Sequence, residues 1–384
     1  MCIVSLMLCG CANKDAEKSD TTSDSAADSG QTSIESVVSE DEKAAEKLIK
    51  EFAYDELPVP ETLMTADHIY CCYSDSNSVI LSVCAKRDKE VNDGPSNKTQ
   101  YLALYNKDIT ELKSINVSFS DSYVTTAVPY KNGVAYVGYN EMVDNNADDI
   151  SEKYYAEWYV VYSDGENELI LDKGICHSYY DIPHLFISEN KVCCLWGHDS
   201  GYVVKQIEDD KPVLLFEETD SLLCSVDVYS NGKEFCFLVS YPESRYATFA
   251  VCDLSGKKYE YALQGKVTSF AIMDDYAVCG TGDEESGYFF VETVKLSDGS
   301  DKAYRVPDSA YCLRGNGGDL VFVNMNWSPY YTDVVGESTV SMTLPSHGKH
   351  CLFYPLGEST YFVLGTAQTQ DNGDVYKFYR LTID

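Results

Sequence analysis

A strand–turn–strand pattern recurs through most of this 384-residue chain and constrains its fold more than any other feature. Its clearest copy spans residues 158–171, where an aromatic and β-branched run meets a polar turn and a second apolar run follows. The turn contains Asp164 and Gly165. Because Gly readily adopts the positive φ of a tight turn and Asp tolerates it, this pattern predicts a β-hairpin. Similar units occupy residues 250–263 and 294–306.

Helical patterns almost disappear after Ala66, and short runs of Val, Ile, Tyr, Phe and Leu alternate with turn residues. The 31 tyrosines suit such half-buried pleated surfaces. Grouped in fours, the runs repeat about every 45 residues, which is similar to the period of β-propeller blades. The sequence therefore predicts an all-β fold, a single β-propeller of about seven four-stranded blades. We expect the blades at residues 68–117, 122–172, 183–216, 222–263, 267–306, 310–344 and 350–384.

The last of these blades has only three strand-like runs before the chain ends. We expect its outermost strand to come from residues 54–64, which would join the two ends of the domain. Pro58 and Pro60 are tolerable there, because an outermost strand is an edge strand. The main alternative architecture is a pair of two-sheet sandwiches, which does not require the observed repeat.

The first eleven residues predict a lipid anchor. Residues 1–8 form an apolar run, too short to span a bilayer as a helix but as long as the core of a signal peptide. The segment Leu8-Cys9-Gly10-Cys11 resembles the lipobox of bacterial lipoproteins, although no basic residue precedes it and Cys9 replaces the usual Ala or Ser. This resemblance implies that Cys11 is acylated and holds the protein on the membrane, on the extracytoplasmic side. The alternative interpretation is a buried N-terminal strand.

Residues 12–50 are expected to link the anchor to the domain. Their first part consists mainly of Ser, Thr, Asp, Ala and Gly, which predicts a disordered tether. Apolar residues from Ile34 to Phe52 then follow at roughly helical spacing, which predicts a short helix that the Pro58–Pro60 segment ends. We place the propeller domain at residues 51–384.

Charge and cysteine usage narrow the classes of partner. The formal net charge of −33 argues against binding of nucleic acid and fits an exported, soluble domain. The chain has 15 cysteines, most of them inside strand-like runs, and no CxxC motif. We therefore expect buried free thiols, with neither a disulfide framework nor a zinc site.

Long loops and aromatic residues suggest a candidate binding surface. The longest second-to-third-strand loops are expected at residues 86–99, 141–153, 324–337 and 367–374, in blades that become neighbours once the ring closes. Five aromatic residues in or beside these loops are the candidate surface: Trp327, Tyr330, Tyr331, Tyr139 and Tyr154. The alternative is that Trp327 only packs against its own loop.

Catalytic and metal-binding motifs are weak. Residues 144–149 resemble the start of a calcium loop, but the EF-hand glycine is missing and Tyr155 stands where the final Glu is needed. Cys176 and His177 are adjacent, and neighbouring side chains usually point apart. We therefore expect no catalytic residue, no metal and no cofactor.

These observations predict a lipid-anchored, extracytoplasmic and monomeric propeller that acts as a binding or scaffold module for a protein or glycan. One alternative is a hydrolase or lyase that acts on surface glycans, which needs carboxylates that converge in a pocket. Another is a structural role in assembly of the cell envelope, which needs an exposed sheet edge or flat face.

Overall fold

The computed structural model describes the chain from residue 51 onward, with short gaps. The described residues are 51–64, 66–85, 98–119, 124, 126–143, 154–178, 181–225, 227–263, 265–283, 287–334, 339–343, 348–357, 359–368 and 374–384. Within them the helix content is a single 3-10 turn, η1 (Glu61–Leu63), and no described helix is long and apolar enough to cross a bilayer.

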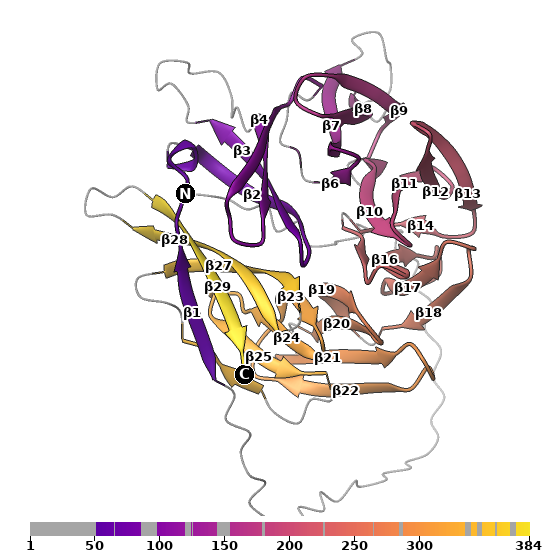
Figure 1. Ribbon diagram of the computed structural model, residues 1–384. Helices are drawn as coiled ribbons and strands as arrows, with labels where there is room; N and C mark the ends of the chain where they lie inside the picture. Colours follow the sequence, from indigo (N-terminus) through magenta and orange to yellow (C-terminus); the bar gives the residue numbers. More distant parts are fainter. Residues whose placement is uncertain are drawn as a thin grey trace, which may run out of the picture. The chain divides into compact units, whose positions relative to one another are not determined.

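Seven antiparallel sheets follow one another along the chain, and each forms one blade of a β-propeller (Figure 1). Blade 1 consists of β2 (Ala66–Ser74), β3 (Ser78–Ala85), β4 (Thr99–Asn106) and β5 (Glu111–Asn116). Blade 2 consists of β6 (Ala127–Tyr130), β7 (Gly133–Val143), β8 (Tyr154–Ser163) and β9 (Glu168–Cys176). Blade 3 consists of β10 (His184–Ser188), β11 (Lys191–His198), β12 (Gly201–Glu208) and β13 (Lys211–Glu218).

The remaining four blades repeat this order, with small variations in blades 4 and 7. Blade 4 begins with two short strands and consists of β14 (Leu222–Leu223), β15 (Tyr229–Ser230), β16 (Glu234–Ser240), β17 (Thr248–Asp253) and β18 (Lys258–Ala262). Blade 5 consists of β19 (Lys266–Met273), β20 (Tyr276–Asp283), β21 (Tyr288–Lys295) and β22 (Asp301–Val306). Blade 6 consists of β23 (Tyr311–Asn316), β24 (Asp319–Val323), β25 (Pro329–Asp333) and β26 (Thr339–Ser341). Blade 7 consists of β27 (Gly348–Gly357), β28 (Thr360–Gln368), β29 (Asp374–Ile383) and β1 (Phe52–Leu57).

The first strands of the blades form a closed ring. Contacts run from β2 to β6, β10, β15, β19, β23 and β27 in turn, and β27 again contacts β2. Each blade can therefore cover both faces of its sheet with its two neighbours. The predicted fold class, an all-β propeller of about seven four-stranded blades, is confirmed.

The N-terminal strand completes the last blade, as the sequence predicts. In Figure 1, β1 lies beside β29, and the two pair in antiparallel register from Phe52 with Ile383 to Leu57 with Phe378. Lys377 Nζ lies 2.5 Å from Glu56 Oε1 across this pairing. The strand begins two residues before the predicted window of 54–64 and ends before Pro58, so the prolines follow the strand.

The expectation that Phe52 belongs to a helix was wrong. Phe52 begins β1 and packs against the cluster that includes Tyr331, Leu381 and Ile383. Phe52 and Tyr54 are partly buried while Ala53 and Asp55 are exposed, as in a strand, where side chains two positions apart share a face. The rest of the expected helix, residues 34–50, and the anchor with Cys11 lie outside the described residues.

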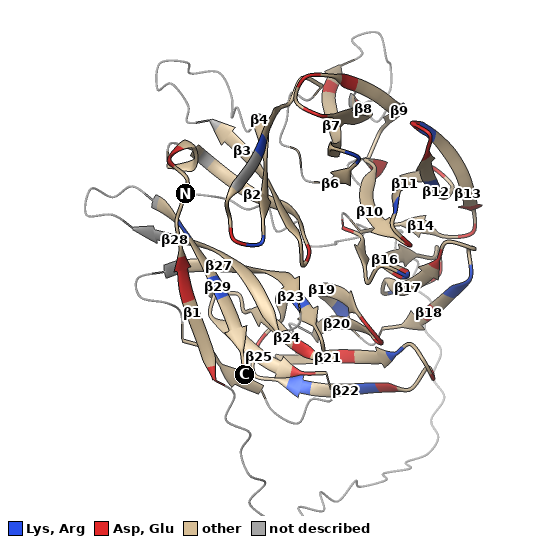
Figure 2. Ribbon diagram, viewed as in Figure 1, with Lys and Arg blue, Asp and Glu red and all other residues tan. Residues whose placement is uncertain are grey.

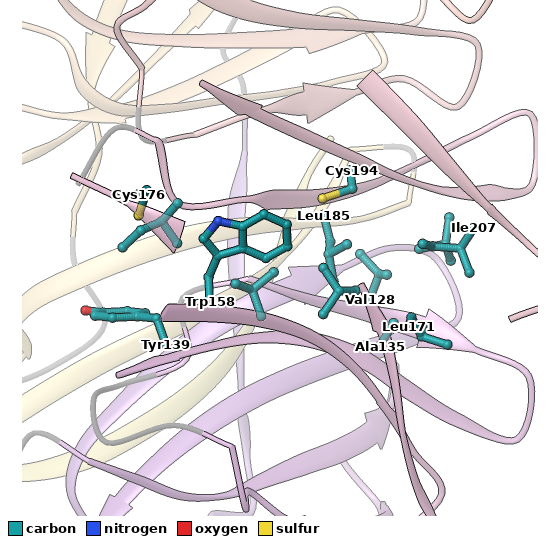
Figure 3. Packing of buried hydrophobic residues seen from close by; sticks show 13 residues of the cluster. Val128, Ala135, Tyr139, Trp158, Leu171, Cys176, Leu185, Cys194 and Ile207 are labelled. Carbon is teal, nitrogen blue, oxygen red and sulfur yellow. The ribbon is translucent and has the colours of Figure 1, made fainter. Parts of the chain in front are cut away.

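The space between blades is filled by apolar side chains. Figure 3 shows one such cluster, in which Trp158 and Leu171 of blade 2 pack toward Leu185, Cys194 and Ile207 of blade 3. Trp158 is only 3% exposed. A side chain at Gly174 would place its Cβ 2.4 Å from the Trp158 ring, so this position in β9 has room only for glycine. The hairpin of residues 158–171 is thus part of the scaffold.

The twelve cysteines in the described residues are all free thiols, as expected. Most are buried in strands, and burial raises the pKa of Cys193 and Cys351, each to about 12. These thiols therefore stay protonated and behave as small apolar side chains.

Deletion of residues 51–57 should destabilise the whole domain. It removes the half-buried side chains of Phe52, Tyr54 and Leu57 and leaves β29 without its outer partner, at a cost on the order of 3 kcal/mol. Urea denaturation of this variant should give a lower midpoint than denaturation of a control that lacks residues 13–30. Equal midpoints for the two deletions would contradict closure of the ring by β1.

Candidate functional site

Two of the five candidate surface residues are part of the core. Tyr331 is 1% exposed, and its hydroxyl donates a hydrogen bond of 2.7 Å to Asp319 Oδ1. Tyr139 is 5% exposed and belongs to the cluster around Trp158. Both residues therefore support the packing of their blades, and neither offers an accessible ring to a partner.

The expected long loop at residues 324–337 is also different in the structure. Residues 324–328 form a tight turn, in which Asn324 Oδ1 accepts hydrogen bonds from the backbone of Asn326 and Ser328, and β25 starts at Pro329. Trp327 packs edge-on against His350, with ring centroids 5.2 Å apart, and Tyr330 stacks on Phe322 at 5.4 Å. These partly buried rings thus pack within and between blades 6 and 7.

The other three predicted loops connect the second and third strands of blades 1, 2 and 7. Their residues 86–97, 144–153 and 369–373 lie outside the described residues. The strand ends that flank them, at the close of β3, β7 and β28 and the start of β4, β8 and β29, lie on the same face of the ring. Blades 7, 1 and 2 are consecutive, because β27 contacts β2 and β2 contacts β6. Tyr154 begins β8 at the end of one of these loops, and its side chain is also outside the described residues.

Exposed apolar side chains gather where blade 2 reaches this face. Met142, Val143 and Ile175 are 37%, 49% and 61% exposed, at the ends of β7 and β9. Tyr155 lies opposite Met142 in the register, and its ring contacts the exposed His177 with centroids 6.2 Å apart. Val143 is next to Met142 in β7 and points to the other face of the sheet, so we call Met142, Ile175, Tyr155 and His177 the rim patch.

The position of the rim patch follows from strand alternation. In β7, Val134 and Tyr136 face blade 1 and are completely buried against it. Met142 lies on the same face of the strand, because side chains two residues apart share a face. At the loop end of β7, this face is no longer covered by a described strand of blade 1, and Met142 is exposed.

A group of titratable side chains lies at the same end of blades 2 and 3. Asp181 is in the connection to blade 3, just after His177, and His198 and Asp199 occupy the turn from β11 to β12. Burial raises the pKa of Asp181 above its usual range, and the nearby charge of Asp199 raises it further. His198 and His177 partly oppose this shift. We call these four residues the acidic cluster.

Gly197 allows the carboxylate of Asp181 to approach the backbone. A Cβ atom built at Gly197 would lie 2.4 Å from Asp181 Oδ1, so any other residue would displace the carboxylate. His198, next to it, is held between two groups. Its Nδ1 lies 3.2 Å from Ser200 Oγ, and its Nε2 lies 3.5 Å from Glu217 Oε1.

Cys176 and His177 do not form a catalytic pair. The Cys176 thiol donates a weak hydrogen bond to the backbone oxygen of Ala156 at 3.8 Å. Burial and the charge of Asp181 raise the pKa of Cys176 to about 12, although the hydrogen bond with Ala156 opposes this shift. The thiolate that a nucleophile requires is therefore scarce at neutral pH.

Across the described strands and loops, no three His, Cys, Asp or Glu side chains are grouped closely enough to hold a metal ion. Figure 2 shows that Asp and Glu are spread around the ring, with Lys and Arg between them. The large negative charge is thus a distributed property of the domain.

Among the similar solved structures, one supports the fold. An oligogalacturonate lyase in complex with manganese has a TM-score of 0.51 at 9% identity, over 88% of this chain and 98% of that one. The polysaccharide lyase Uly1 has a TM-score of 0.49 at 10% identity, over 83% and 90%. The computationally designed protein Ika8 has a TM-score of 0.46 at 13% identity, over 84% and 98%. No protein-family model and no curated protein matches the sequence.

The low identities limit this similarity to the fold, and the class defined by fold and topology is a seven-bladed β-propeller. The rim patch and the acidic cluster are defined by contacts within this chain and not by the similar structures. The acidic cluster has no signature in the sequence, because its members lie in two segments that only the packing of blades 2 and 3 brings together.

Replacement of Asp181 by Asn should stabilise the protein at pH 7 and above. A carboxyl whose pKa is raised on folding favours its protonated form in the folded state, so its charge destabilises the fold at high pH and this cost is relieved as the pH falls. We expect Asp181→Asn to raise the melting temperature by about 1–2 °C at pH 7–8. The difference should vanish below about pH 4, where the carboxyl is protonated in both states.

Asp301→Asn is the matched control, because Asp301 is an exposed carboxylate on β22. It removes the same formal charge without relieving burial. An equal gain from both variants across this pH range would show that net charge, and not the environment of Asp181, sets the effect.

Proposed function

We propose that this protein is a lipid-anchored, extracytoplasmic β-propeller that binds a protein or glycan partner at the rim of blade 2. The anchor is the acylated Cys11 of the lipobox-like segment. The protein acts as a monomer and requires no cofactor, and its net charge of −33 makes nucleic acid an unfavourable partner.

The rim patch is the observation that carries this proposal. Single exposed apolar residues are common on protein surfaces, but Met142 and Ile175 are exposed together at one end and on one face of blade 2. Tyr155 and His177 add a pair of rings beside them. Burial of these side chains by a partner would contribute about 25 cal/mol for each Å² of apolar surface removed from water.

The chemistry of the patch suits both partner classes. A tyrosine ring offers a flat apolar face with a polar hydroxyl at one end. Tyr155 can therefore stack on a sugar or on a peptide. Met142 is flexible and adapts to irregular protein surfaces. A glycan array and an extract of cell-envelope proteins, probed with the same protein, distinguish the two.

A second candidate is a lyase or hydrolase that acts on surface glycans. The acidic cluster favours it, because a half-buried carboxylate with a raised pKa beside two histidines is a candidate acid–base group. The oligogalacturonate lyase shares the propeller fold, which supplies a scaffold for such chemistry and no further evidence. In this case Asp181→Asn abolishes product formation, whereas a binding module never turns over its ligand.

The lipid anchor is tested by Cys11→Ser. Acylation of a cysteine requires its thiol. After cell lysis the variant should therefore appear in the soluble fraction instead of the membrane fraction, and after phase separation in detergent it should stay in the aqueous phase. Cys9→Ser is the control, because this cysteine precedes the acylated position and its replacement should leave the protein with the membrane. Equal partitioning of Cys11→Ser and the unaltered protein would contradict the proposed anchor.

The binding surface is tested by the double variant Met142→Asp and Ile175→Asp. Charges at these positions should weaken partner capture by at least about tenfold, since each blocks burial of an apolar side chain. Leu214→Asp is the control, because Leu214 is 55% exposed on the outer strand of blade 3. Capture that survives in the double variant, or is lost equally in the control, would show that the rim patch is not the binding surface.

A further inference from the structure

Arg314 occupies an unusual position for a charged residue. It lies on β23, the first strand of blade 6, and the first strands of all seven blades form the inner ring. Its guanidinium carbon is 4.7 Å from the centroid of the Tyr229 ring and 5.8 Å from that of Tyr354. The cation therefore lies beside two aromatic rings.

These contacts place Arg314 in the interior of the ring. Tyr229 belongs to the first part of blade 4, and Tyr354 belongs to the first strand of blade 7. Blade 5 lies between blades 4 and 6, so Tyr229 reaches Arg314 past a whole blade. Cys71, on the first strand of blade 1, also interacts electrostatically with Arg314. Side chains from such separate blades meet only toward the axis.

The guanidinium group has donors to spare. Nη1 donates to the backbone oxygen of Leu313 at 2.8 Å. Among the described residues, Arg314 forms no ion pair and no further hydrogen bond, and none of its nitrogens is a buried atom without a partner. Arg314 as a whole is only partly buried, so its other N–H groups can still meet a ligand. Arginine presents five N–H donors in a planar fork, which matches a carboxylate.

Asp227 supplies the complementary group. It lies two residues before Tyr229 and is exposed, and it interacts electrostatically with Arg314, Tyr229 and His184. His184 is on the first strand of blade 3, and its Nε2 is buried without a hydrogen-bond partner. An exposed carboxylate thus lies two residues from the ring that contacts Arg314, and among the described residues it forms no ion pair with this arginine.

The backbone just before Arg314 is irregular. The pairing of β23 with β24 shifts between Tyr311 and Arg314, and Cys312 has a φ of 48°, which is unfavourable for a residue with a side chain. Blade 5 holds this bulge in place, because Thr268 Oγ1 and Ser269 Oγ each donate to Ala310 O at 2.6 Å. Bulges of this kind often redirect a side chain at a functional site.

We propose that Arg314 binds the carboxylate of a small hydroxy acid in the interior of the ring, beside Tyr229 and Tyr354, with Asp227 accepting a hydrogen bond from the ligand hydroxyl. A singly charged carboxylate is favoured over phosphate, because Asp227 and the net charge of −33 repel a second negative charge. This site is separate from the rim patch and does not depend on the proposed function.

The test is isothermal titration calorimetry of the full chain with acetate, lactate and inorganic phosphate. Lactate should bind more tightly than acetate by about tenfold, since its hydroxyl adds a hydrogen bond to a charged acceptor, and phosphate should bind more weakly than both. Absence of binding of either carboxylate, or tighter binding of phosphate, would overturn the proposal.

Variants assign the binding to these residues. Arg314→Lys keeps the charge but loses the planar fork, and it should weaken lactate binding by about tenfold or more. Arg305→Lys is the matched control, because Arg305 lies 4.4 Å from the Tyr288 ring on the outer strand of blade 5 and should bind no ligand. Equal effects of the two variants would overturn the assignment.

Asp227→Asn should change ligand binding in the opposite direction from Arg314→Lys. This variant leaves Arg314 intact, so it tests the site even if replacement of Arg314 prevents folding. Removal of this exposed charge should strengthen acetate binding by about threefold or more and reduce the preference for lactate. The double variant at Met142 and Ile175 should bind lactate as the unaltered protein does, so failure at the rim patch and failure at this site are distinguishable. Weaker acetate binding by Asp227→Asn would contradict the proposed geometry.

Discussion

The pairing of β1 with β29 is the constraint on which the rest of the propeller depends. A blade cannot cover both faces of its own sheet, so each of the seven relies on two neighbours. After residue 348 the chain supplies only three strands to blade 7, and the six residues from Phe52 to Leu57 complete it. Because the ring of first strands also closes from β27 to β2, the outer edge and the inner ring are joined at the same place.

Much of this fold could be predicted from the sequence, because its signals are local. Turn residues and alternating apolar runs mark each blade within a few residues. The errors arose where one pattern fits two structures. Phe52 fits a helical spacing as well as a strand, and the turn at Asn324 closes through side-chain hydrogen bonds that a sequence does not display.

The candidate sites were harder to predict, for a different physical reason. Tyr139 and Tyr331 stand in aromatic segments near expected loops, but only the register decides which face of a strand is covered. Asp181 and Asp199 come together through the packing of blades 2 and 3, and Arg314 meets Tyr229 across blade 5. Contacts that depend on the closed ring have no signature in residue spacing.

Closure of the ring also explains how irregular backbone persists near its axis. The first strands of blades 5 and 6 both contain register shifts, and Cys312 keeps a positive φ. In an open stack of sheets, β23 could slide along its neighbour and relax this geometry. In the closed ring it is held between β19 and β27, and hydrogen bonds from Thr268 and Ser269 fix its start. By completing blade 7 and so closing the ring, β1 at the outer edge helps to maintain the position of Arg314 at the centre.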